Sequence, residues 1–65
     1  MRVREAREQA RITQGEAAEH LGISRPTYIK MEKNPEIIEM GEARKLAELF
    51  GVSIDDINFF ESDCN

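Results

Sequence analysis

Cysteine, tryptophan and long apolar runs are scarce in this chain. It has one cysteine, Cys64, and no tryptophan among its 65 residues, so no internal disulfide can form. No group of Cys and His residues has the spacing of a metal site, and we expect neither a metal nor another cofactor. No apolar run approaches the ~18 residues of a membrane span. The sequence therefore predicts a cytoplasmic protein without a membrane partner, stabilised by packing.

A catalytic constellation is also absent from the sequence. There is no nucleophile accompanied by a base and an orienting group, and no glycine-rich loop that would cradle a phosphate. The lone histidine, His20, has no second histidine or cysteine near it in the chain. The sequence therefore predicts that the protein is not an enzyme and has no small-molecule substrate.

Positive charge is scarce overall but unevenly distributed. The formal net charge is -4 and the isoelectric point is about 4.9. Residues 1–33 nevertheless carry seven basic and five acidic side chains, whereas residues 34–65 carry two basic and eight acidic ones. Acidity argues against a polyanionic partner when it is averaged over the chain. The first half can still contact such a partner locally, because its own net charge is positive.

Apolar periodicity predicts an all-α chain of five helices. A capping box, in which Ser or Thr is followed three residues later by an acid, precedes two of them at Thr13 and Ser53. Pro26 suits the first turn of another, because its missing N–H would have no partner there. No strand pattern appears, and we expect one compact domain, residues 1–60, with a short C-terminal tail, residues 61–65. The expected helices span residues 2–10, 14–21, 25–32, 39–50 and 53–60.

Glycine and proline separate these helices by short connections. Gly22 and Gly51 are placed to end helices in a left-handed conformation. Asn34-Pro35 predicts a loop over residues 33–38. The apolar residues expected on the inner side of the fourth helix are Met40, Ala43, Leu46, Ala47 and Phe50.

The second and third helices carry the pattern of a helix-turn-helix unit. Such a unit joins two helices through a turn of about three or four residues and lays the second helix in the DNA major groove. It needs a small residue where the helices cross, a glycine at the turn and bulky apolar residues on the buried side of the second helix. Ala18, Gly22, Tyr28 and Met31 supply these at spacings of four, six and three residues. The four together make the pattern fairly specific.

At these positions the chain resembles the lambda-repressor-like helix-turn-helix family of phage repressors, Cro proteins and bacterial Xre regulators. The matching stretches, VREAREQARITQGEAAEHLGIS, RPTYIKME and RKLAELFGVSIDDI, cover nearly the whole chain. The resemblance implies a compact five-helix domain that binds a double-stranded DNA operator as a homodimer. It also implies a sequence-specific transcriptional regulator, such as a repressor or Cro-like switch of a phage or mobile element.

The resemblance implies roles for individual residues as well. Arg7 and Glu32 match an internal ion pair that links the first and third helices. Gln14 matches a glutamine that meets a phosphate, and residues on the third helix match positions that face DNA. The predicted DNA-binding set is Gln14, Ser24, Arg25, Pro26, Thr27, Lys30 and Lys33.

Side-chain chemistry agrees with these implied roles. Arginine presents a planar fork that suits guanine O6 and N7, so Arg25 is the candidate for direct base readout, at ~1 to 3 kcal/mol of discrimination. Pro26 and the methyl group of Thr27 could contact a thymine methyl group, and Lys30 could contact guanine or a phosphate. Backbone amides at helix starts can hold phosphates without net positive charge.

Four bulky apolar residues in the acidic half have two interpretations. Ile37, Ile38, Phe59 and Phe60 are difficult to bury in a chain of this length. They predict a subunit interface of a two-fold homodimer, which would also keep the acidic residues away from the DNA. Alternatively, they close the core of one subunit.

Two other functions stay open from the sequence. One is an antitoxin that uses this domain for autoregulation. The other is an acidic protein-interaction module that has kept the fold and lost DNA binding. Glu36 and Glu39 favour the second, because they lie in a loop where related proteins often carry glycine, lysine or arginine. Selection of binding sites from random DNA would separate a DNA-binding regulator from such a module.

Overall fold

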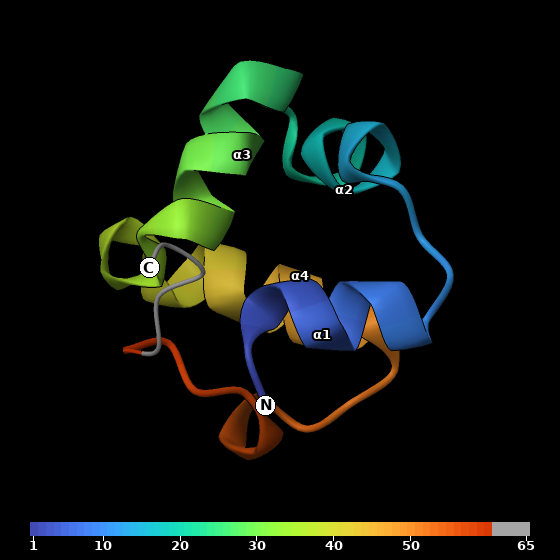
Figure 1. Cartoon of the computed structure of the whole chain (residues 1–65), viewed down its shortest axis with the longest axis vertical. Helices are drawn as coiled ribbons and strands as arrows, with labels where there is room; N and C mark the ends of the chain where they lie inside the picture. Colours follow the sequence, from blue (N-terminus) through green and yellow to red (C-terminus); the bar gives the residue numbers. More distant parts are fainter. Residues whose placement is uncertain (61–65) are drawn as a thin grey trace.

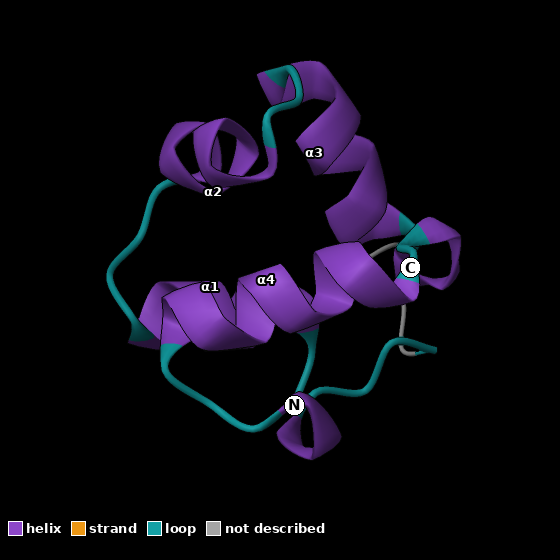
Figure 2. Cartoon of the chain, turned by 180° about the vertical axis from the view of Figure 1, so that it is seen from behind, coloured by secondary structure: helices purple, strands orange, loops and turns teal. Residues whose placement is uncertain are grey.

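The computed structural model describes residues 1–60, so the predicted tail and Cys64 lie outside the described residues. The fold is all-helical across this range, as expected. Figure 1 shows α2 and α3 at one end of the molecule, while α1 and α4 lie together across its middle, and Figure 2 shows the same arrangement from behind. In chain order the elements are α1 (Val3–Gln9), α2 (Gln14–Leu21), α3 (Arg25–Lys33), the 3-10 turn η1 (Pro35–Ile37), α4 (Met40–Phe50) and the 3-10 turn η2 (Ile54–Asp56).

Helices α2 and α3 begin where side chains satisfy their first amides. Thr13 Oγ1 accepts a hydrogen bond from the Glu16 amide at 3.1 Å, and the Glu16 carboxylate accepts one from the Thr13 amide at 2.9 Å. This capping box lowers the pKa of Glu16, chiefly through the backbone hydrogen bond from Thr13. Ser24 Oγ accepts a hydrogen bond from the Thr27 amide at 3.3 Å and so caps the start of α3.

Three helices end with one motif, in which a left-handed residue redirects two amides onto earlier carbonyls. After α2, Gly22 has φ 71°, and the Ile23 amide bonds to the Ala18 carbonyl at 3.0 Å. Gly51 repeats this geometry after α4, with the same φ of 71°. After α1 the left-handed residue is Arg11, with φ 59°, which is an uncommon conformation for a residue with a side chain.

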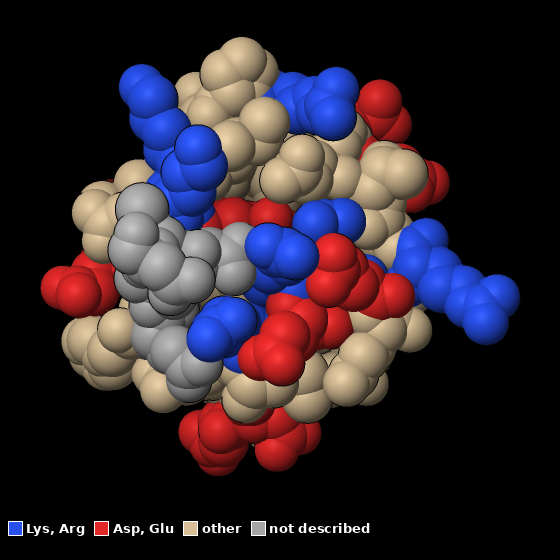
Figure 3. Space-filling model, in the orientation of Figure 1, with Lys and Arg blue, Asp and Glu red and all other residues tan. Residues whose placement is uncertain are grey.

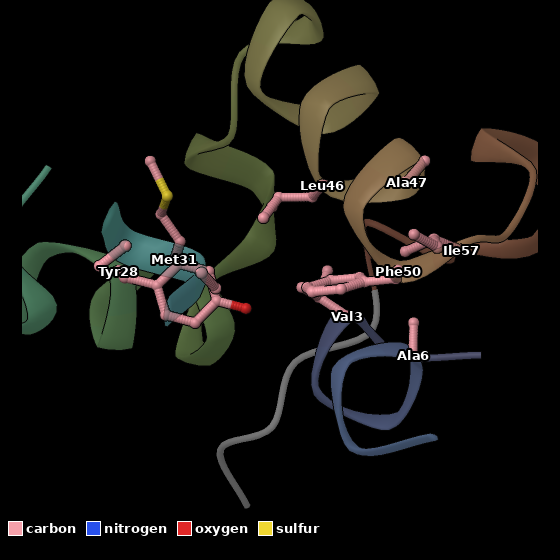
Figure 4. Packing of buried hydrophobic residues seen from close by; sticks show 10 residues of the cluster. Val3, Ala6, Tyr28, Met31, Leu46, Ala47, Phe50 and Ile57 are labelled. Carbon is pink, nitrogen blue, oxygen red and sulfur yellow. The ribbon is translucent and has the colours of Figure 1, made fainter. Parts of the chain in front are cut away.

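The hydrophobic core lies where the four helices meet, and its largest fully buried side chains include Tyr28 and Leu46. Figure 4 shows Tyr28 and Met31 of α3 on one side of Leu46 of α4, with Val3 of α1 beside Phe50 on the other side. Burying a side chain of this size stabilises a fold by about 1.5–3 kcal/mol. The core therefore holds α3 firmly by its inner face.

The predicted fifth helix, residues 53–60, does not form, and the described residues contain four α-helices. The amides of Asp56 and Ile57 bond to carbonyls three residues earlier, at 2.9 and 3.2 Å, which makes a single 3-10 turn. The next amide, of Asn58, instead donates to the Met1 carbonyl at 2.7 Å. The Met1 ammonium donates in return to the Asp56 carbonyl at 2.8 Å. The start of the chain thus takes the hydrogen bonds that would have continued the helix.

Two smaller expectations are also corrected. Met40 is 64% exposed, although the other four apolar residues expected on the inner side of α4 are buried. Because Met40 is the first residue of α4, it lies beyond the part of the helix that packs on the core. The predicted loop over residues 33–38 contains η1, and its first residue, Lys33, ends α3. In the described part of the chain, no helix is both long and apolar enough to span a membrane.

Candidate nucleic-acid interface

Helices α2 and α3 form a compact helix-turn-helix. Ala17 and Ala18 are 0% and 2% exposed, so their small side chains let α3 approach the backbone of α2 closely. The turn between the helices consists of residues 22–24 and begins with the left-handed Gly22. This arrangement fixes where α3 emerges from the rest of the molecule.

The two sides of α3 differ sharply. Tyr28, Met31 and Glu32 are buried and face the core. Side chains of the opposite side stand in solvent. Figure 3 shows Lys and Arg projecting over α3, a mixture of acidic and basic side chains over α1, and Asp and Glu along the lower edge, around η2. Basic side chains therefore lie along the outer side of α3 despite the acidity of the chain. The predicted site residues of α3 that are exposed are Arg25, Pro26, Thr27, Lys30 and Lys33.

The hydroxyl groups of Ser24 and Thr27, at the start of α3, form a hydrogen bond with each other. Ser24 Oγ and Thr27 Oγ1 lie 2.9 Å apart and share a hydrogen bond, in addition to the cap that Ser24 provides. Both side chains remain exposed. A hydroxyl can accept a second hydrogen bond, so either one could still contact a polar ligand while α3 stays capped.

Glu32 is the one buried charged side chain of the described core, at 3% exposure, and it collects donors from three elements. Arg7 Nε of α1 donates to Glu32 Oε2 at 2.6 Å, which places the predicted ion pair in direct contact. Tyr28 Oη donates to the same oxygen at 2.6 Å. Gln14 Nε2, at the start of α2, donates to Glu32 Oε1 at 3.2 Å. The sequence pattern did not indicate the last two contacts.

These contacts shift the pKa values of Tyr28 and Arg7, two of the three residues that donate to Glu32. Burial, and then the hydrogen bond to Glu32, raise the pKa of the Tyr28 hydroxyl well above its ordinary value. Burial alone would lower the pKa of Arg7, but the hydrogen bond and the charge of Glu32 outweigh it and raise that pKa. The Arg7 guanidinium therefore stays charged and the Tyr28 phenol stays neutral at physiological pH. Within residues 1–60 no three His, Cys, Asp or Glu side chains are arranged to hold a metal ion.

A surface groove of about 590 Å³ lies between η1, the start of α4 and the segment after η2. Two of the four apolar residues singled out above, Ile38 and Phe59, line it and pack against the core. Phe60 lines it too but is 81% exposed, and Ile37, nearby in η1, is 49% exposed. Arg44 and the acidic residues Glu36 and Asp55 complete its wall, so the groove is apolar with charges of both signs.

Comparison with known proteins settles the family. The family model for helix-turn-helix proteins matches residues 3–57, which include every α-helix described above. The chain belongs to the lambda-repressor-like helix-turn-helix family. The α2–α3 unit is the helix-turn-helix of this chain, and the residues on the outer side of α3 form the candidate interface.

Relatives of this helix-turn-helix protein include three curated proteins. An uncharacterised HTH-type transcriptional regulator of Methanocaldococcus jannaschii is 42% identical over 52 residues, covering 80% of this chain and 79% of the relative. An uncharacterised HTH-type transcriptional regulator of Archaeoglobus fulgidus is 32% identical over 62 residues, covering 95% and 87%. A longer HTH-type transcriptional regulatory protein of the same organism is 38% identical over 66 residues, and this chain spans only 21% of its length. No solved structure matches the chain significantly.

Proposed function

We propose that this protein is a transcriptional regulator that binds double-stranded DNA and reads the major groove with α3. The observation that carries the proposal is the division of α3 into two sides. Its inner side is fixed by Tyr28 and Met31, while Arg25 and Lys30 project from the outer side. Helix-turn-helix proteins insert the second helix into the groove with its first residues toward the bases.

Each exposed residue of α3 has a proposed task. Arg25, at the first position of the helix, forms a bidentate contact with guanine O6 and N7. Lys30 contacts a guanine or a phosphate, and Lys33 contacts a phosphate. Gln14 uses one amide hydrogen for Glu32, so its second amide hydrogen is left to bind a phosphate. Ser24, Pro26 and Thr27 complete the contact surface at the turn.

Selection of sites from random duplex DNA, followed by affinity measurements, tests the proposal. We expect one sequence to be enriched, with log affinity falling by about 0.9 for each phosphate contact per tenfold rise in salt. Arg25→Ala should lose about 5- to 150-fold on the selected site, corresponding to ~1 to 3 kcal/mol, and much less on random DNA. Arg4→Ala, which removes an exposed arginine of α1, is the matched control and should change neither affinity substantially. Equal losses on selected and random DNA would exclude base readout by Arg25.

We also propose that two copies bind the operator together, joined through the groove beside η1 and η2. A two-fold interface must be complementary to itself, and this surface offers both a groove and an exposed Phe60 to enter the partner's groove. Arg44 and the acidic Glu36 and Asp55 would likewise meet as opposite charges. Such a dimer should select two half-sites separated by ~34 Å or a multiple of that distance.

Repression is the regulatory mode that we propose, in the manner of a Cro-like switch. A domain bound over a promoter excludes other proteins from the same stretch of DNA, and this requires no activating surface. A reporter gene placed behind the selected site should therefore lose expression when the protein is produced. The Arg25→Ala variant should restore expression, and increased reporter expression with the wild type would contradict repression.

An acidic protein-interaction module is the second candidate. The groove and the exposed acids Glu36 and Glu39 favour it, because they form a surface that would bind another protein more readily than a phosphate backbone. If random-site selection at low salt enriches no sequence, this second function is preferred over the first.

A further inference from the structure

Ile29 is an apolar side chain of α3 that lies outside the hydrophobic core. It is partly exposed on α3, in the middle of the helix. Among the described residues, the apolar side chains that form or pack against the core do not include it. The inner side of α3 is already occupied by Tyr28, Met31 and Glu32. Packing against the hydrophobic core therefore does not account for the isoleucine at this position.

The surroundings of Ile29 place it within the candidate interface. Residues three and four positions apart are neighbours on a helix surface, so Ile29 adjoins Arg25 and Pro26 on one turn and Lys33 on the next. All three neighbours are exposed. Side chains on a helix lean toward its N-terminus, so Ile29 is directed toward the turn that contains Pro26. Ile29 and Pro26 thus form a short apolar strip, which is flanked by cations at both ends.

We propose that Ile29, together with Pro26, is a specificity-determining residue that recognises the 5-methyl group of a thymine in the major groove. This methyl group is the apolar feature that a T·A pair presents there. The flanking cations are suited to hold the helix against phosphates while the strip meets the base edge. The inference rests on the proposed function, because it assigns one more contact to the same helix. It predicts a required thymine next to the base read by Arg25.

A structural role for Ile29 makes a different prediction. Glu32 lies one turn away from Ile29 on α3 and forms the buried pair with Arg7. If Ile29 only shielded this pair from water, its removal would weaken binding to every DNA equally, through loss of folded protein. A specificity-determining Ile29 instead acts at one base pair.

Replacing single thymines by uracil in the selected site separates these roles, since uracil lacks only the methyl group. For the wild-type protein we expect one thymine position at which uracil weakens binding about three- to fivefold, as expected for one buried methyl group. Ile29→Ala should weaken binding to the thymine site at least as much and should no longer distinguish thymine from uracil there. Leu49→Ala is the matched control, because it truncates another partly exposed apolar side chain, which lies on α4 and outside the candidate interface. It should retain the discrimination at that position.

The outcomes are distinct for the two proposals. If no sequence is selected from random DNA, the proposed function fails and this inference fails with it. If a site is selected but Ile29→Ala still discriminates thymine from uracil as the wild type does, only the inference is overturned. Circular dichroism should verify that the variant is folded. If Ile29→Ala is unfolded, Ile29→Val gives the same comparison with a smaller truncation. If Ile29→Val then distinguishes thymine from uracil as strongly as the wild type does at every thymine, the inference is overturned.

Discussion

At the scale of the residue, Glu32 connects the core to the candidate interface. Its carboxylate accepts four hydrogen bonds, which come from Arg7, Gln14 and Tyr28. A buried charge is strongly destabilising when it lacks partners, because it has lost its hydration. The cluster therefore ties the last turn of α3 to α1 and to the start of α2, and it fixes the orientation of Gln14 at the same time.

The first prediction at this scale concerns Arg7. Replacing it by methionine leaves the Glu32 carboxylate buried without its cation, and the free energy of unfolding should fall by about 3–5 kcal/mol. Arg4→Met is the matched control. Arg4 pairs with Glu8 in solvent, with both side chains about half exposed, and its loss should cost less than about 1 kcal/mol.

Urea denaturation followed by circular dichroism measures both variants. The double variant with Arg7→Met and Glu32→Met should recover part of the stability, since it buries no unpaired charge. Arg7→Met and Arg4→Met with equal stabilities would show that the cluster contributes no more than a surface pair.

The second prediction concerns the Tyr28 hydroxyl, whose pKa is raised in the folded protein by burial and by Glu32. As the pH rises above about 10, the unfolded chain loses this proton more readily than the folded chain. The stability contributed by Tyr28 is therefore complete below that pH and declines above it. Tyr28 is the only tyrosine and there is no tryptophan, so tyrosinate absorbance reports on this hydroxyl alone. We expect that absorbance to rise together with the loss of helical circular dichroism.

The Tyr28→Phe variant is the control for this titration. It removes one donor to Glu32 and should lose about 1.5–3 kcal/mol of stability at neutral pH. The part of the alkaline decline that comes from the phenol should disappear. Tyrosinate absorbance that appears near the ordinary pKa, while the wild-type protein remains helical, would contradict the buried hydrogen bond.

At the scale of the element, the left-handed helix ends decide where the chain turns. Gly51 and Arg11 occupy the same position of the same motif, after α4 and α1 respectively. Gly51→Ala should destabilise the protein by about 1–2 kcal/mol, because a side chain is strained in this conformation. Arg11→Gly should change stability in the opposite direction, by up to about 1 kcal/mol.

Gly41 supplies a control within α4 itself. A Cβ atom built there meets nothing within 4 Å, and its backbone is helical. Gly41→Ala should therefore stabilise the protein by about 0.5–1 kcal/mol. A Cβ atom at Gly51 also meets nothing within 4 Å. If Gly51→Ala destabilises the protein and Gly41→Ala stabilises it, the difference therefore comes from backbone conformation and not from steric contact. Thermal unfolding of the three variants measures this, and equal effects of the two alanines would exclude the explanation.

At the scale of the whole molecule, the groove predicts self-association. Met40 lines the groove and is largely exposed, so Met40→Glu would introduce a charge into a buried dimer interface. We expect the wild type to be dimeric at high concentration in sedimentation experiments and Met40→Glu to be monomeric. Gln9→Glu introduces the same charge on the exposed surface of α1 and should leave the dimer intact. A wild type that stays monomeric at every concentration would exclude this interface.

Much of the candidate site could be anticipated from residue types and spacing. Ala18, Gly22, Tyr28 and Met31 indicated how α3 packs, and their burial or conformation in the structure agrees with that pattern. The spacing did not identify the partners of Glu32, because Gln14 and Tyr28 reach it through side-chain geometry. Ile29, which we propose as a further contact, was not singled out either, since an isoleucine in a helix is ordinarily assigned to the core.

The helix boundaries around α2 and the start of α3 were determined by the sequence itself. Thr13, Gly22 and Ser24 act on amides or carbonyls within a few residues, so their effect does not depend on the rest of the fold. Tertiary structure decided the fate of residues 53–60. Ser53 caps the start of this segment as it would cap a helix. The Asn58 amide, however, donates to the Met1 carbonyl instead of to a carbonyl within the segment, so no second turn forms. Two nearly equivalent hydrogen bonds compete there, and only the packed position of the distant chain start selects between them.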